Sequence, residues 1–66
     1  MTITLNGESR SVTAAATIAA LVRELNLIPA TLLIEHNGRA LHREEWNSRP
    51  VCEGDKIEFI RVVAGG

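Results

Sequence analysis

Hydrophobic and polar residues alternate along the opening segment, MTITLNGESRSVT. Ile3 and Leu5 fall on one side of this alternation, and Asn6-Gly7 follows directly. Alternation is typical of a half-buried strand, and Asn-Gly favours a two-residue hairpin turn because both residues tolerate positive φ. Residues 10–13 then read as a returning strand. The pattern predicts an N-terminal β-hairpin.

The hydrophobic period changes after residue 17. Four apolar residues recur at the spacing of one helical face: Ile18, Leu21, Val22 and Leu25. Thr17 is suited to cap the start of this helix, and Asn26 is suited to end it. Pro29 lies just beyond and prevents continuation. We predict one amphipathic helix of about nine residues, a length that needs a sheet for support.

Strand-like patterns return in the second half of the chain. Residues 32–36 and 39–41 read as two strands around a second Asn-Gly turn, Asn37-Gly38. A single helical turn is expected over 43–46, and Gly54-Asp55 is expected to make a turn before the last strand. The segment KIEFIRVV, residues 56–63, reads as the last strand.

The predicted fold class is α+β, with the element order ββαββ. One helix packed on one face of a small mixed sheet buries the apolar surface of both. The first and last strands are the most apolar, so we expect them side by side at the centre of the sheet.

Composition excludes several classes of function. The chain has 66 residues, 7 Lys and Arg against 8 Asp and Glu, and only Trp46 and Phe59 as aromatic residues. It therefore lacks the basic stripe and the stacking residues that nucleic-acid binding needs. It also lacks an apolar stretch long enough to span a membrane. Cys52 is the single cysteine, which suits a reducing compartment, so we expect a cytoplasmic protein without a targeting segment.

Three short motifs carry a resemblance to a known family. They are Arg-Glu-Glu-Trp at 43–46, Gly-Asp-Lys-Ile at 54–57 and Val-Ala-Gly-Gly at 63–66. With the order of elements, they make the chain similar to the ubiquitin-like β-grasp fold. Within that fold, the chain resembles the ThiS family of bacterial thiamine-biosynthesis sulfur carriers.

The resemblance implies a β-grasp domain over residues 1–62 and a flexible functional tail over 63–66. It implies that an E1-like adenylating enzyme of the ThiF type uses ATP to adenylate the carboxylate of Gly66. A sulfur donor protein then converts the terminus to a thiocarboxylate, which a thiazole synthase of the ThiG type consumes. Gly65 and Ala64 would thread into these partner sites. The chain itself would be a co-substrate, with no bound cofactor, no metal and no enzymatic activity.

A docking surface is expected beside the tail. If Ile57 and Phe59 face the helix, strand alternation places Ile60 and Val62 on the opposite face. Leu33 on a neighbouring strand would extend this apolar surface. Uncovered apolar surface marks many partner sites, so we expect these three residues to contact the adenylating enzyme.

Other candidate residues are given structural roles. We expect Cys52 to be a small half-buried residue near a turn and not a sulfur-transfer thiol. His36 and His42 together with Cys52 lack the ligand pairs of a metal site. Trp46 should cover the helix–sheet edge, with its indole N–H on a backbone carbonyl. Residues 43–45 are expected to be turn and solvent residues.

Three other functions remain open from the residues alone. The small subunit of molybdopterin synthase has a similar order of elements and a similar tail, although the short length and Arg-Glu-Glu-Trp argue against it. A ubiquitin-like protein modifier would join Gly66 to lysines of other proteins. A β-grasp interaction module would carry an inert tail.

Overall fold

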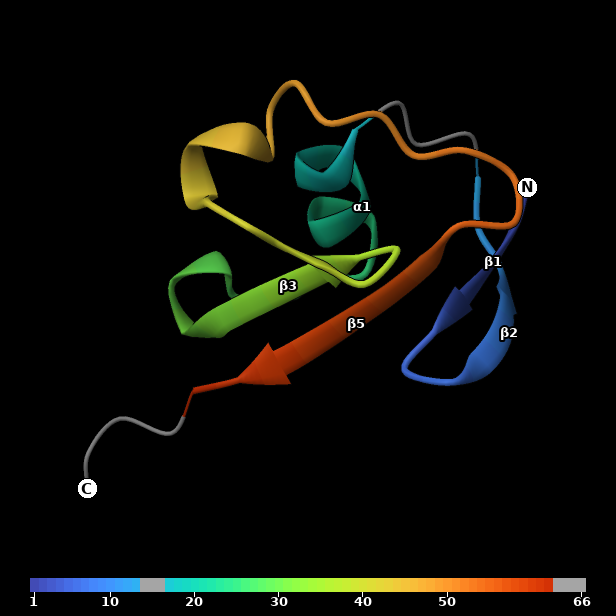
Figure 1. Ribbon diagram of the computed structural model, residues 1–66, viewed down its shortest axis with the longest axis horizontal. Coiled ribbons are helices and arrows are strands. Elements are labelled where there is room, and N and C mark those ends of the chain that lie inside the picture. Colours follow the sequence, from blue (N-terminus) through green and yellow to red (C-terminus); the bar gives the residue numbers. More distant parts are fainter. Residues whose placement is uncertain (14–16, 63–66) are drawn as a thin grey trace.

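A computed structural model of the protein describes residues 1–13 and 17–62. Within these residues the chain forms five strands, one α-helix and two short 3₁₀ helices. In chain order they are β1 (Thr2–Leu5), β2 (Glu8–Ser11), α1 (Ile18–Glu24), η1 (Pro29–Thr31), β3 (Leu32–His36), β4 (Arg39–Leu41), η2 (Arg43–Glu45) and β5 (Lys56–Arg61). Figure 1 shows α1 packed against one face of the sheet.

Both Asn-Gly pairs make the hairpin turns that the sequence predicts. Asn6 and Gly7 have φ angles of 50° and 82°, and Asn37 and Gly38 have φ angles of 53° and 84°. Positive φ at both central residues is the signature of the type I′ turn, whose twist matches that of the joined strands. The turns join β1 to β2 and β3 to β4, each pair being antiparallel.

The strand order in the sheet is β2-β1-β5-β3-β4. β1 and β5 are adjacent and parallel, whereas the other neighbouring pairs are antiparallel, so the sheet is mixed. The prediction that the first and last strands lie together at the centre is confirmed. The strands expected over 32–36, 39–41 and 56–63 all form, so the observed order is ββαβββ and the expected order ββαββ counts one strand too few.

Helix α1 begins as expected and ends earlier than expected. The Oγ1 atom of Thr17 accepts a hydrogen bond from the N–H of Ala20 at 3.2 Å, which confirms the N-cap. The helix has 7 residues and closes at its C-cap, Leu25. Asn26 follows with a φ of 56°, in the left-handed region that ends many helices, so the expected length of about nine residues was too long.

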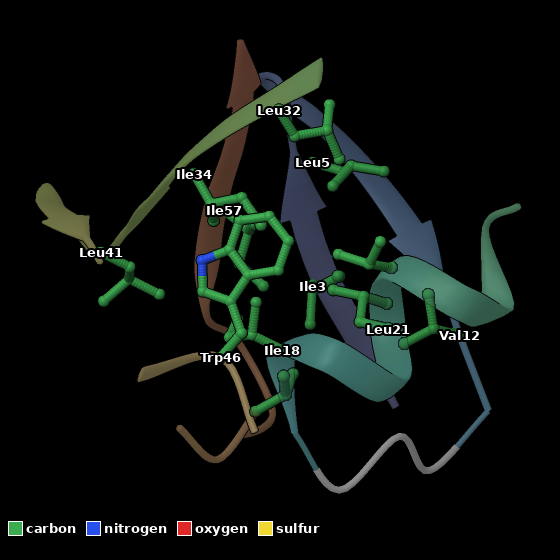
Figure 2. Close-up of a cluster of buried hydrophobic side chains, with 12 residues drawn as sticks. Ile3, Leu5, Val12, Ile18, Leu21, Leu32, Ile34, Leu41, Trp46 and Ile57 are labelled. Atoms are coloured by element: carbon green, nitrogen blue, oxygen red, sulfur yellow. The ribbon is translucent and has the colours of Figure 1, made fainter. Parts of the chain in front are cut away.

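The core lies between α1 and the covered face of the sheet. Its most fully buried side chains come from the helix and from three different strands: Ile3, Ile18, Leu21, Val22, Ile34 and Ile57. Figure 2 shows the ring of Trp46 inserted among Ile18, Ile34 and Ile57. Trp46 is only 5% exposed, so it is part of this core.

The surroundings of Trp46 differ from the expectation in two ways. Its indole Nε1 is buried without a hydrogen-bond partner among the described residues, so the predicted bond to a backbone carbonyl is wrong. The guanidinium of Arg43 lies 4.8 Å from the centre of the ring, in cation–π geometry, and donates to the carbonyl oxygen of Pro29 at 2.8 Å. Arg43 therefore fastens η2 to η1 and is more than a solvent residue.

Within residues 1–13 and 17–62, no helix has the length and apolar character needed to cross a membrane.

Candidate functional site

Three exposed apolar side chains gather on the face of the sheet that α1 leaves uncovered. Leu33 on β3 is 57% exposed, Ile60 on β5 is 46% exposed and Val62 just after β5 is 50% exposed. Leu33 lies directly opposite Ile60 in the β3–β5 register. We call these three residues the outer patch.

The position of Val62 in this patch is fixed by a backbone hydrogen bond. Its N–H donates to the carbonyl oxygen of Thr31 at 2.8 Å, so the pairing of β5 continues one residue past the end of the strand. On the other side of β5, Ile57 is fully buried and Phe59 is half-buried. This alternation places the outer patch where the sequence pattern predicts it, and its role as a docking surface stays a prediction.

Two carboxylates border the outer patch. Glu35 on β3 lies directly opposite Glu58 on β5, and both side chains are half-buried. Neither forms an ion pair with any residue that the structure describes. The uncovered face of the sheet is therefore apolar at the end of β5 and acidic towards the middle of that strand.

The expected reaction site lies outside the described residues. This applies to the carboxylate of Gly66, to Gly65 and Ala64, and to the whole 63–66 tail. The described chain runs to Val62, so the outer patch is the described surface that stands closest in sequence to these residues. Their roles stay predictions.

One buried polar cluster was not predicted from the sequence. His36 is 7% exposed, and its Nε2 lies 2.7 Å from Oδ2 of Asp55. Nε of Arg49 donates to Nδ1 of the same ring at 3.1 Å. Because Arg49 can only donate, Nδ1 accepts, and the ring proton therefore sits on Nε2 and is donated to Asp55.

Asp55 collects further hydrogen bonds at the start of β5. Its carboxylate accepts from the backbone N–H of Cys52 at 2.8 Å and from Nδ2 of Asn37 at 3.2 Å. Partial burial acts to raise the pKa of Asp55, but the hydrogen bonds from His36, Cys52 and Asn37 together lower that pKa below its ordinary value. The cluster ties the β3–β4 turn to the loop before β5, and this makes its role structural.

The remaining candidate residues are spread over the surface. Cys52 is exposed, so the expectation that it is half-buried is wrong, because its backbone and not its thiol is tied to Asp55. His42 is exposed at the start of η2 and lies away from the buried His36. The described part of the chain contains no group of three or more His, Cys, Asp or Glu residues placed to hold a metal ion.

Comparison with known proteins identifies relatives along the whole chain. The model of the ThiS family matches residues 3–66. The chain is 30% identical over 66 residues to the sulfur carrier protein ThiS of Escherichia coli, and the match covers all of both proteins. It is also 30% identical over 66 residues to the thiazole synthase of Paramagnetospirillum magneticum. That match covers all of this chain but only 20% of the length of the thiazole synthase.

Solved structures agree with this match. The crystal structure of the thiamine biosynthesis protein ThiS from Geobacter metallireducens superposes with a TM-score of 0.86 at 30% identity, covering all of both chains. The solution structure of a thiamine biosynthesis protein from the same organism gives a TM-score of 0.82 at 32% identity. It covers all of this chain and 88% of the other.

Proposed function

The chain belongs to the ThiS family, and from this membership we propose that it is a sulfur carrier for thiazole formation in thiamine biosynthesis. The observation that carries the proposal is the match to the Escherichia coli sulfur carrier along the full length of both proteins. The family match extends to residue 66 and so includes the Ala-Gly-Gly segment on which the proposed chemistry rests.

The proposed reaction takes place at the carboxylate of Gly66. A carboxylate oxygen attacks the α-phosphorus of ATP, pyrophosphate leaves, and the product is an acyl adenylate. Hydrosulfide (HS⁻), released by the sulfur donor protein, then attacks the carbonyl carbon, AMP leaves with the electron pair of the broken C–O bond, and a thiocarboxylate remains. Glycine suits this position because a side chain at residue 65 or 66 would obstruct the narrow channel that protects the adenylate from water.

Catalysis is assigned to partner proteins. We propose an E1-like enzyme of the ThiF type for the adenylation, a sulfur donor protein for the second step, and a thiazole synthase of the ThiG type as the acceptor. The thiazole synthase of Paramagnetospirillum magneticum supports the last of these, because a fifth of that protein is similar to the whole of this chain. The carrier acts in each step as a co-substrate.

The outer patch is the proposed contact surface for the adenylating enzyme. Leu33, Ile60 and Val62 are each about half exposed, and Val62 is the last residue described before Ala64 and the glycines. An enzyme whose active site takes up the tail must contact the carrier close to the end of β5. Apolar surface at that place can be buried by the enzyme while the terminus enters its active site.

Replacing Ile60 with glutamate tests this assignment. We expect Ile60→Glu to raise the KM for the carrier in ATP–pyrophosphate exchange by at least about ten-fold, with a folded domain, because a charge would be buried at the contact. Ile28→Glu is the matched control, since Ile28 is 67% exposed and lies outside the outer patch. Equal KM values for the two variants, or an unfolded Ile60→Glu domain, would contradict the assignment.

A further inference from the structure

A groove of about 350 Å³ lies on the helix side of the sheet, opposite the outer patch. Its walls are Leu25 and Leu27, which directly follow α1, and Phe59 from β5. All three are partly exposed and pack against the core from outside. Arg10 on β2 and Arg61 on β5 also line the groove.

The register of the sheet points both arginines to this side. Arg61 lies opposite Leu32, and Arg10 lies opposite Ile3. Directly paired residues on neighbouring strands project from the same face, and both the leucine and the isoleucine are buried beneath α1. The two guanidiniums therefore belong to the groove and not to the outer face.

The groove combines apolar walls with two guanidiniums, and Glu8, which projects from the same face opposite Leu5, is not part of its lining. No carboxylate among the described residues lines it. Neither Arg10 nor Arg61 forms an ion pair with a residue in 1–13 or 17–62. A complementary occupant must therefore offer an apolar side chain together with carboxylates that the guanidiniums can bind.

The groove also lies beside the end of β5. Ile60 and Val62 face outward there, whereas Phe59 and Arg61 face the groove. The last residues of β5 can thus be contacted from both faces at once by a protein that receives the tail.

We propose that this groove is a second docking site for the adenylating enzyme, occupied by an acidic segment of that enzyme that carries an apolar side chain. This inference rests on the proposed function and adds a contact to the outer patch. The enzyme contacts the end of β5 on both faces of the sheet. The two arginines orient the carrier by pairing with carboxylates of the enzyme.

The test is ATP–pyrophosphate exchange catalysed by the adenylating enzyme, with the whole chain as the varied substrate. We expect the double variant Arg10→Glu/Arg61→Glu to raise KM at least about ten-fold at low salt and to leave kcat unchanged. The increase should shrink as ionic strength rises from about 0.05 M to about 0.5 M, because salt screens exposed charges. The milder double variant Arg10→Gln/Arg61→Gln should also raise KM, by a smaller factor. It replaces the glutamate variant in the test if the two glutamates prevent folding.

Lys56→Glu is the matched control. Lys56 is exposed at the opposite end of β5, does not line the groove, and undergoes the reversal of charge of one arginine, so it is compared with the single variants Arg10→Glu and Arg61→Glu. A wild-type KM for both double variants, or a rise for Lys56→Glu equal to that of the single variants, would overturn the proposal.

Two further outcomes would overturn the proposal in different ways. If the unaltered chain supports no exchange at all, the proposed function fails and the docking role of the groove fails with it. If sedimentation shows a dimer of the unaltered chain that the arginine variants lose, the occupant of the groove is a second copy, whereas the proposed function stands.

Discussion

Asp55 joins parts of the chain that the sequence keeps far apart. It binds His36 and Asn37 at the β3–β4 turn and the backbone of Cys52 in the loop before β5. Sequence reasoning placed turns at Asn37-Gly38 and Gly54-Asp55 correctly, because each is a local signal. It missed the cluster, because the meeting of the two turns depends on the pairing of β3 with β5 and not on neighbouring residues.

The charge of Asp55 should stabilise the fold in a pH-dependent way. Hydrogen bonds lower the pKa of Asp55 in the folded state, so its contribution is fully present above the unfolded pKa of about 3.9. The contribution is lost as the pH falls through the lower folded value. We therefore expect Asp55→Asn to be less stable than the unaltered chain at pH 7, with a difference that shrinks below about pH 4.

Urea unfolding followed by the fluorescence of Trp46, the single tryptophan, measures this difference. A stability difference between Asp55→Asn and the unaltered chain that widens in acid, or equal stability of the two at neutral pH, would contradict this prediction. Either result would show that the hydrogen bonds to Asp55 do not favour its charged form.

At the scale of elements, both hairpin turns also hold the central strand. Oδ1 of Asn6 accepts from the backbone N–H of Phe59 at 2.8 Å, and Oδ1 of Asn37 accepts from that of Lys56 at 2.8 Å. The Asn-Gly pattern predicts the turns because positive φ is a local preference. It does not predict these bonds to β5, which require the finished sheet.

Replacing Asn6 with glycine separates the two roles of this residue. Glycine accepts the positive φ of the turn but has no oxygen for the N–H of Phe59, so we expect Asn6→Gly to lower the free energy of unfolding by about 1 kcal/mol. Asn6→Asp keeps an acceptor and should lose less. Equal stability of the two variants in urea unfolding would mean that the bond to β5 contributes nothing.

At the scale of the whole molecule, the sheet has one face covered by α1 and one left open. The sequence predicts this arrangement well, because one amphipathic helix can cover only one face and β5 alternates between buried and exposed residues. Leu33 and Ile60 were therefore expected to be exposed, and they lie directly opposite each other. The groove could not be predicted, since it combines β2, the segment directly after α1 and β5, which the sequence separates widely.

The intact mass of the chain, after incubation with ATP, a ThiF-type adenylating enzyme and a sulfur source, tests the central claim most directly. We expect a mass gain equal to the exchange of one oxygen for one sulfur. Because the chemistry is assigned to the carboxylate of Gly66, the gain should be absent when Gly66 is deleted. An unchanged mass, or the same gain in the chain without Gly66, would contradict the assignment of this protein as a thiocarboxylate sulfur carrier.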